Sequence, residues 1–287
     1  MAKGRELKRR IKSFEGMRKI TSTMEMVAAS KLKRAHDRVL AARPYARALA
    51  AVIGDLYSPE LAEFYPLLRQ PKQVKRAAIL LITSNRGLAG GFNTSLIKEA
   101  NTLRASLEKQ GAEVEMHVVG KKGVGHFRFL GKPMAVSRTD IGDVPTSAHA
   151  TELATPLAQG FRNGTLDAVH VVYAKYNSPL STPPVMESVL PVTPPARTGP
   201  VRDYLLFPDA RAILAELIPA YVRNAVYRAL VETACGEQGA RRTAMKNATD
   251  NAGELIDQLT RNFNRARQAQ ITQEIAEIVG GAEALQG

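Results

Sequence analysis

The stretch LKRAHDRVLAARPYARALAAVIGDL, residues 32–56, decides the fold. Its apolar side chains recur at alternating steps of three and four residues, a spacing typical of a helix in a left-handed coiled coil. These side chains are Leu32, Ala35, Val39, Ala42, Ala46, Leu49, Ile53 and Leu56. A less regular apolar stripe extends the pattern upstream from Val27 to Leu7. We therefore predict one long helix over residues 1–58.

Two prolines mark special positions of this helix. Pro44 has no N–H, so the carbonyl of Leu40 loses its partner and the helix should bend there without ending. Ser58-Pro59 is expected to stop the helix, because a residue before proline disfavours helical geometry. A helix of this length, on the order of 80 Å, cannot cover its own apolar seam and needs a partner helix.

The partner helix is predicted in the C-terminal segment, residues 208–287. Its helical pattern runs from about Pro219, a residue suited to a first helical turn. Small residues on one face would let two helix backbones approach closely. They are Ala240, Ala244, Ala248 and Ala252. We also interpret Gly236, Gly239 and Gly253 as close-contact or bend positions, since glycine inside a helix costs about 1 kcal/mol relative to alanine. An antiparallel two-helix coiled coil formed by both termini is the simplest arrangement.

The middle of the chain, residues 75–200, is predicted to be an inserted Rossmann-like α/β domain. Short apolar runs alternate there with helical patterns, and this alternation implies a mostly parallel sheet. We expect strands at 77–83, Glu113–Val119 and Ala168–Tyr173, an edge strand at Val185–Val192 and a helix near Thr151–Phe161. The predicted fold class is therefore α/β plus long α.

A glycine-rich turn follows the first predicted strand. Its sequence is Gly87-Leu88-Ala89-Gly90-Gly91, and a helix is expected to start near Asn93. Phosphate-binding turns occupy such places, but this one lacks both the G-x-G-x-x-G spacing and the Lys-Ser/Thr ending of a P-loop. A tight strand-to-helix turn explains the glycines without a ligand, and we favour that interpretation over a nucleotide site.

The residue types that usually carry chemistry form no recognisable site in the sequence. Cys235 is the only cysteine, so no disulfide forms within the chain and thiol-ligated metal sites are excluded. The five histidines show no metal-ligand spacing. Common hydrolase and zinc-protease motifs do not occur. We expect no catalytic, cofactor or metal site.

The positive charge is concentrated near the N-terminus. The chain carries a net charge of +13, and residues 1–47 hold 14 Lys/Arg against four Asp/Glu. Such a segment should bind an acidic partner. Acidic residues interrupt the basic run and tryptophan is absent, so an acidic protein surface is favoured over DNA. A basic coiled-coil nucleic-acid-binding protein is the alternative.

Three blocks of the sequence resemble the gamma subunit family of the rotary F-type ATP synthase. They are MRKITSTMEMVAASK at 17–31, SNRGLAGGFN at 84–93, and residues 244–281. Their order and spacing agree with the family over essentially the whole chain. The resemblance implies a central rotor shaft whose coiled coil lies inside a ring of alternating alpha and beta subunits. A globular foot would join the epsilon subunit and the membrane rotor ring of c subunits.

By this resemblance the chain is a non-catalytic subunit of a proton-translocating complex that makes ATP from ADP and phosphate. It would couple rotation of the membrane ring to conformational change at catalytic sites on partner subunits. It is expected to have no cofactor, no small-molecule ligand of its own and no nucleic-acid partner. Its expected location is the cytoplasmic face of the bacterial inner membrane, where it would be peripheral through the complex.

The resemblance also implies partner contacts along both terminal helices. Arg267 and Gln268 match a pair that hydrogen-bonds the catch loop of a beta subunit, and a guanidinium fork beside an amide suits directional bonds to acidic loops. The other implied contacts are Met24, Arg241, Thr272 and Glu274. Three residues depart from the usual Asp, Cys and Met of the family, namely Asn85, Ala89 and Arg242.

Overall fold

The structure is a computed structural model of the 287-residue chain. It describes residues 2–57, 64–193, 207 and 209–284. The chain divides into two compact units, one made of Ala29–Arg241 and the other of Met1–Ala28 with Arg242–Gly287.

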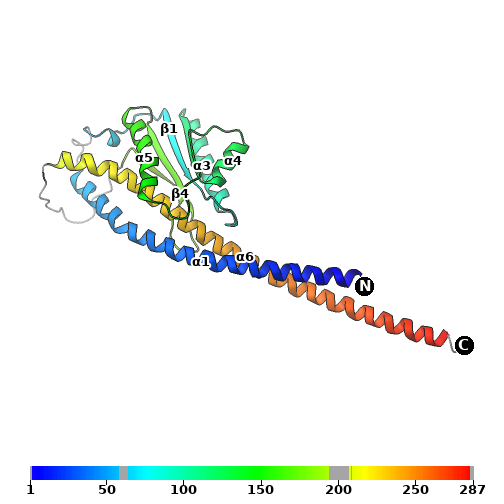
Figure 1. The fold of residues 1–287 in the computed structure, drawn as a ribbon. Coiled ribbons are helices and arrows are strands. Elements are labelled where there is room, and N and C mark those ends of the chain that lie inside the picture. Colours follow the sequence, from blue (N-terminus) through cyan, green and yellow to red (C-terminus); the bar gives the residue numbers. More distant parts are fainter. Residues whose placement is uncertain (1, 58–63, 194–206, 208, 285–287) are drawn as a thin grey trace. The chain divides into compact units, whose positions relative to one another are not determined.

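Both terminal segments fold as long helices (Figure 1). Helix α1 spans Ala2–Leu56 and helix α6 spans Ala210–Ala284. Within the unit 29–241 the two helices run antiparallel. Leu32, Ala35 and Val39 of α1 share a buried cluster with Val231 and Cys235 of α6, whereas Leu49 and Ile53, near the end of α1, share another with Leu214 and Ile218, near the start of α6. The coiled-coil prediction for this part of the heptad seam is confirmed.

Each of the two long helices contains a proline in its interior. Pro44 lies inside α1 and does not end it, as predicted. The predicted segment 208–287 contains α6, but the prediction that Pro219 lies in its first turn is wrong, because α6 begins at Ala210 and Pro219 lies well inside it. The carboxylate of Asp209 accepts the backbone N–H of Ala212 at 2.8 Å and so caps the earlier start. The predicted stop at residues 58–59 falls outside the described residues.

A five-stranded sheet forms the centre of the unit 29–241. Its strands are β1 Arg76–Ile82, β2 Glu113–Val119, β3 Val136–Arg138, β4 Ala168–Ala174 and β5 Pro184–Leu190. Their order is β3-β2-β1-β4-β5, and β5 alone pairs antiparallel, at the edge of the sheet. The predicted parallel sheet with an edge strand is therefore confirmed.

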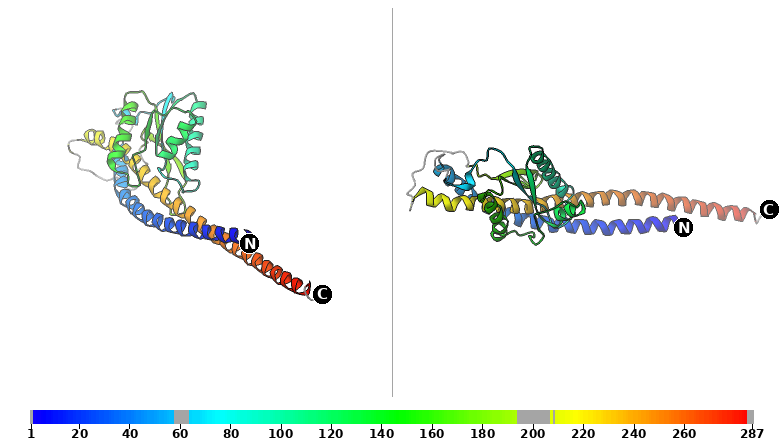
Figure 2. Two further views of the ribbon diagram at one scale, coloured as in Figure 1. Left: turned by 45° about the vertical axis from the view of Figure 1, so that its right-hand side comes forward. Right: turned by 90° about the horizontal axis from the view of Figure 1, so that it is seen from above.

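Helices cover both faces of this sheet (Figures 1 and 2). They are α3 Phe92–Lys109, α4 Lys121–Phe129 and α5 Ser147–Arg162. Because side chains alternate along a strand, Ile79 and Leu81 of β1 pack with α3 and α4 in one core cluster, while Leu80 and Ile82 pack with α5, α1 and α6 in the other. The two long helices therefore build part of the core of the α/β domain.

Three short elements were not predicted from the sequence. They are the 3-10 turn η1 Pro66–Leu68, helix α4 and strand β3. Helix α4 contains Gly123 and Gly125, which weaken a helical pattern. Strand β3 has only three residues, too few for an alternating pattern to be recognised.

Two of the three predicted close-contact glycines in α6 are confirmed. A Cβ added at Gly236 would lie 3.2 Å from Cβ of Thr182, and one added at Gly239 would lie 2.8 Å from the carbonyl oxygen of Pro179. Gly253 is not a close-contact position, because a Cβ there would meet no atom within 4 Å, and its role as a bend position stays a prediction. The first two glycines let α6 lie directly against the loop that joins β4 to β5.

The second unit consists of the first part of α1 and the last part of α6. Ala28, Met245 and Ala252 are buried there, and the hydroxyls of Thr21 and Thr249 are hydrogen-bonded at 2.8 Å. Both views in Figure 2 and the view in Figure 1 show these segments side by side, with α6 continuing beyond the N-terminal end of α1. Small residues and paired hydroxyls thus join the two helices at close range.

The single thiol of the chain should be chemically inert while the fold is intact. Cys235 is buried in the cluster shared by α1 and α6, and burial raises the pKa of its thiol to about 12. At pH 8 its thiolate fraction is then on the order of 10⁻⁴. We expect an aromatic disulfide reagent to label no thiol in the native chain within an hour and one thiol per chain after denaturation. Rapid labelling of the native chain would contradict this burial.

Candidate partner-binding surface

The predicted contact residues near the end of α6 lie on an exposed stretch of helix. Arg267, Gln268, Thr272 and Glu274 are all exposed. Their recorded side-chain bonds stay within α6: Thr272 donates to the Gln268 carbonyl at 3.0 Å, and Gln270 donates to Glu274 at 2.9 Å. Among the described residues the Arg267 guanidinium has no hydrogen bond or ion pair. Its donors are therefore available to an acceptor on another protein.

An apolar stripe runs along the same end of α6. Ile271, Ile275, Ile278 and Val279 have exposed fractions of 47%, 57%, 71% and 56%. Their spacing places them on one face of the helix. Large exposed apolar patches mark sites of protein or membrane interaction. This end of α6 therefore has an unpartnered amphipathic face next to free hydrogen-bonding groups.

The first part of α1 carries a second exposed apolar stripe. Met17, Ile20, Met24 and Val27 recur at steps of three and four residues, and Met24 is 39% exposed. Arg18 and Lys19 are exposed on the same turns of helix. The predicted contact Met24 thus lies on a surface that combines apolar and cationic side chains.

Arg241 is held by its own chain. Its guanidinium donates to the side chains of Glu237 at 2.5 Å and Gln238 at 3.0 Å, and to the Gly87 carbonyl through Nε at 3.3 Å and Nη2 at 3.2 Å. The side chains of Arg241 and Glu237 are 12% and 7% exposed. Burial raises the pKa of Glu237 even though the Arg241 cation opposes the shift. Arg241 therefore joins α6 to the glycine-rich turn.

The glycine-rich turn is organised by side chains of this chain. Asn93 accepts the backbone N–H of Ser84 at 3.0 Å, and Asn85 accepts the N–H of Lys121 at 2.8 Å. The Asn85 amide also donates to the carbonyls of Thr139 and Ile141, at 3.1 and 2.8 Å. These bonds connect the carboxyl ends of β1, β2 and β3. They support the interpretation of a tight structural turn, and they give Asn85 a role as donor that an aspartate carboxylate does not have.

One further cross-connection was not visible in the sequence. Lys31 of α1 forms an ion pair with Asp143 at 2.6 Å, and both side chains are about a quarter exposed. Lys31 ends the first block that resembles the gamma subunit family, which was the only hint in the sequence. Nothing marked Asp143, because it lies in a loop between β3 and α5.

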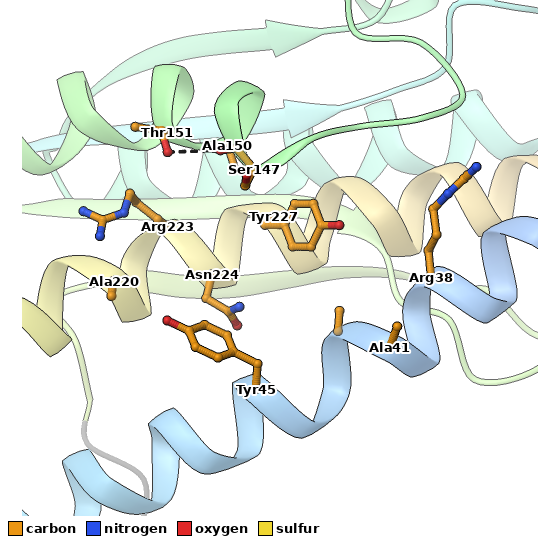
Figure 3. Close-up of a pocket in the computed structure, with 11 residues that line it drawn as sticks. Arg38, Ala41, Tyr45, Ser147, Ala150, Thr151, Ala220, Arg223, Asn224 and Tyr227 are labelled. Carbon is orange, nitrogen blue, oxygen red and sulfur yellow. Dashed lines mark hydrogen bonds between the residues drawn. The ribbon is translucent and has the colours of Figure 1, made fainter.

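A cavity of about 390 Å³ opens between α1, α5 and α6 (Figure 3). It is lined by Arg38, Ala41, Ala42, Tyr45, Ser147, Ala150, Thr151, Ala220, Arg223, Asn224 and Tyr227. In Figure 3 the side chains of Tyr45 and Asn224 lie next to each other, whereas Arg38 and Arg223 are at opposite sides of the cavity and point apart. The charged groups therefore do not converge on one ligand position.

The described residues contain neither a cluster suited to a metal ion nor a helix suited to spanning a membrane. No group of three or more His, Cys, Asp or Glu among them is arranged to hold a metal ion. No helix in the described part of the chain has the length and apolar character needed to cross a bilayer.

Comparisons with known proteins agree with this architecture. The ATP synthase family model matches residues 3–285. The ATP synthase gamma chain of Gemmatimonas aurantiaca is 61% identical, with both chains covered completely. That of Moorella thermoacetica is 45% identical, over 99% of this chain and all of the relative.

Solved structures show the same fold at low sequence identity. A chain of the Euglena gracilis mitochondrial ATP synthase, from a structure of its OSCP, F1 and c-ring, superposes with a TM-score of 0.67 at 19% identity, covering 99% of this chain and 95% of that one. A chain from the central stalk and c-ring of the Tetrahymena thermophila mitochondrial ATP synthase gives a TM-score of 0.59 at 24% identity, covering 80% of this chain and 99% of that one. From the family model and the sequence relatives together, this chain belongs to the ATP synthase gamma chain family.

Proposed function

We propose that this chain is the central rotor shaft of a proton-translocating ATP synthase and is itself non-catalytic. The observation that carries the proposal is the end of α6, where an apolar stripe and hydrogen-bonding side chains are exposed together on a helix without a local partner. A rotating shaft needs such a surface, because it acts on its surroundings through contacts that differ from one orientation to the next.

The proposed partners follow from the family and from the surfaces. Alpha and beta subunits of the catalytic ring would surround the exposed helix ends, and nucleotide and metal would be bound by those subunits. The unit 29–241 would join the epsilon subunit and the ring of c subunits. The complex would hold the chain peripherally at the cytoplasmic face of the bacterial inner membrane.

The contact set is proposed as Met24, Arg241, Arg267, Gln268, Thr272 and Glu274. Arg267 and Gln268 are its centre, because they are exposed and charge-assisted hydrogen bonds from a guanidinium contribute about 1.5–3 kcal/mol each. The basic balance of residues 1–47 supports attraction to acidic segments of the ring. Arg241 is the least accessible member, since its side chain is 12% exposed and bonded to its own chain.

The proposal is tested with the double variant Arg267→Ala, Gln268→Ala in the assembled complex. Both side chains are exposed, so the fold should be unchanged, while the lost hydrogen bonds should lower ATP synthesis about tenfold, the equivalent of 1.4 kcal/mol. Proton-driven ATP synthesis in vesicles is the measurement. The control pair Arg162→Ala, Asn163→Ala, also an exposed arginine and amide, should keep full activity.

Two results would count against the shaft. Normal synthesis by the Arg267 and Gln268 variant would remove this pair from the contact set. Recovery of the wild-type chain as a free homo-oligomer that binds DNA in a salt-dependent way, without alpha and beta subunits, would favour the nucleic-acid alternative.

A further inference from the structure

A second cavity, of about 370 Å³, lies at α1, α6 and the segment that follows β4. It lies entirely within the unit 29–241. Its lining residues are Arg43, Ala46, Arg47, Lys175, Tyr176, Asn177, Arg228 and Glu232. Four of the eight carry a positive charge and one carries a carboxylate. Cationic side chains from three segments of the chain thus line one cavity.

Only part of this positive charge is neutralised by the chain itself. Arg228 forms a short ion pair with Glu187, which lies on β5 outside the cavity. Arg43 reaches the Tyr176 carbonyl at 3.4 Å. Arg47 and Lys175 are exposed and have no ion pair with any described residue. An excess of positive charge therefore remains at the opening of the cavity.

The one acidic group in the lining, Glu232, is hydrogen-bonded within the chain. The carboxylate of Glu232 accepts the backbone N–H of Tyr176 at 2.9 Å, and Glu232 is 7% exposed. Burial is the main cause that raises the pKa of this carboxyl, and the cations Arg228 and Arg43 oppose the shift. Glu232 therefore holds the segment after β4 against α6, and the exposed cations at the rim remain without a counter-charge.

Two buried polar groups of the lining lack normal partners. Nε of Arg228 is buried and has no hydrogen-bond acceptor among the described residues. Tyr176 is 4% exposed, and its hydroxyl lies beside the Cys235 thiol, which belongs to the buried cluster of α1 and α6 and not to the cavity lining. Buried polar groups without partners cost free energy. Of the two groups, the Nε of Arg228 is the one that an acceptor oxygen of a ligand in the cavity would satisfy.

We propose that this cavity binds a phosphate-type oxyanion, the phosphoryl group of a small phosphate ester or of a phospholipid headgroup. Guanidinium groups bind phosphoryl oxygens through paired hydrogen bonds, and an ammonium group adds a point charge. The volume is within the range of small-molecule sites, about 300–1,000 Å³. The site departs from the expectation, drawn from the sequence, that this chain has no small ligand of its own.

The test compares the full-length chain with the double variant Arg47→Gln, Lys175→Gln. Both side chains are exposed and without internal partners, so the variant should fold normally. The control is Lys33→Gln, Arg34→Gln, which removes the same two charges from exposed positions of α1 outside the cavity. Titration calorimetry with glycerol 3-phosphate, at ionic strength fixed with chloride, measures binding of a soluble ester. Flotation with phosphatidylglycerol or phosphatidylcholine vesicles measures binding of a lipid headgroup.

We expect the wild type and the control variant to bind one of these phosphate probes, and the cavity variant to bind it at least about tenfold more weakly. Loss confined to glycerol 3-phosphate identifies a soluble ester as the ligand, and loss confined to phosphatidylglycerol vesicles identifies a headgroup. Equal weakening in both variants would show attraction to net charge alone and would overturn the site. Absence of binding to either probe up to about 10 mM phosphate would overturn it as well. Neither outcome bears on the shaft function, which is measured by ATP synthesis.

Discussion

Replacement of Arg241 by alanine is expected to lower the free energy of unfolding by about 3–5 kcal/mol. The change removes the partner of Glu237, whose side chain is 7% exposed, and leaves a carboxylate without compensation in the interior. It also removes both donors to the carbonyl of Gly87. Denaturant unfolding of the purified chain, followed by circular dichroism, gives the measurement.

The neighbouring residue provides the control for this prediction. Arg242 is exposed, so Arg242→Ala should change the free energy of unfolding by no more than about 0.5 kcal/mol. A second variant, Arg241→Met with Glu237→Leu, removes both charges and should recover part of the loss, because an uncharged pair leaves no buried ion. If the single variant Arg241→Ala were as stable as wild type, the buried ion pair would not be a stabilising contact.

The destabilisation of Arg241→Ala should also depend on pH. Burial already raises the pKa of Glu237 in the folded chain above its ordinary value of 4.5. A raised pKa means that the folded state holds the proton more tightly than the unfolded state. The contribution of Glu237 to the free energy of unfolding therefore falls as the pH rises through the raised value. Without the Arg241 cation the pKa of Glu237 rises further. The decrease in the free energy of unfolding caused by Arg241→Ala should therefore be small at pH 4 and grow toward neutral pH.

Gly120→Ala is expected to lower the free energy of unfolding by about 3–4 kcal/mol or to prevent folding. Gly120 has φ 99° and ψ 138°, which lies close to a backbone region used almost only by glycine. A Cβ at this position would lie 2.2 Å from the carbonyl oxygen of Thr83. That carbonyl follows β1 directly, so neither backbone can move away without disturbing the sheet.

Gly111→Ala separates the effect of the backbone angle from the effect of the steric clash. Gly111 has φ 86°, but a Cβ there would meet no atom within 4 Å. The strain of a left-handed backbone alone costs about 1–2 kcal/mol. Thermal and denaturant unfolding of both variants would show the difference, and a Gly120 variant no less stable than the Gly111 variant would contradict the close approach to Thr83.

Much of the fold was predictable because its elements repeat a simple period. The heptad spacing from Leu32 to Leu56 predicted the part of α1 that packs on α6, and strand β2 was predicted with its observed bounds, Glu113–Val119. The first turn of α6 was not predicted, because a single carboxylate at Asp209 caps a helix that begins at Ala210, well before Pro219, a proline suited by residue type to a first turn. A capping bond depends on one local geometry that a periodic pattern does not contain.

The candidate surface was predictable only in part. A sequence can indicate that Arg267 and Gln268 are polar residues on a helix, and the structure adds that they are exposed. The sequence could not indicate that Arg241 would hydrogen-bond the glycine-rich turn, because Arg241 is 154 positions away from Gly87 along the chain. Such pairs depend on how the sheet and α6 pack, which is set by the whole core and not by any local motif.

The fixed bonds between α6 and the sheet have a mechanical consequence. Thr233 accepts the N–H of Ala174 at 3.3 Å, Glu232 accepts that of Tyr176, and Arg241 holds Gly87, while Gly239 lies against the Pro179 carbonyl. These attachments lie on successive turns of one helix and reach the end of β4, the loop between β4 and β5, and the glycine-rich turn after β1. This segment of α6 is therefore attached to the sheet domain at several points, so a torque applied to the sheet is transmitted to the helix.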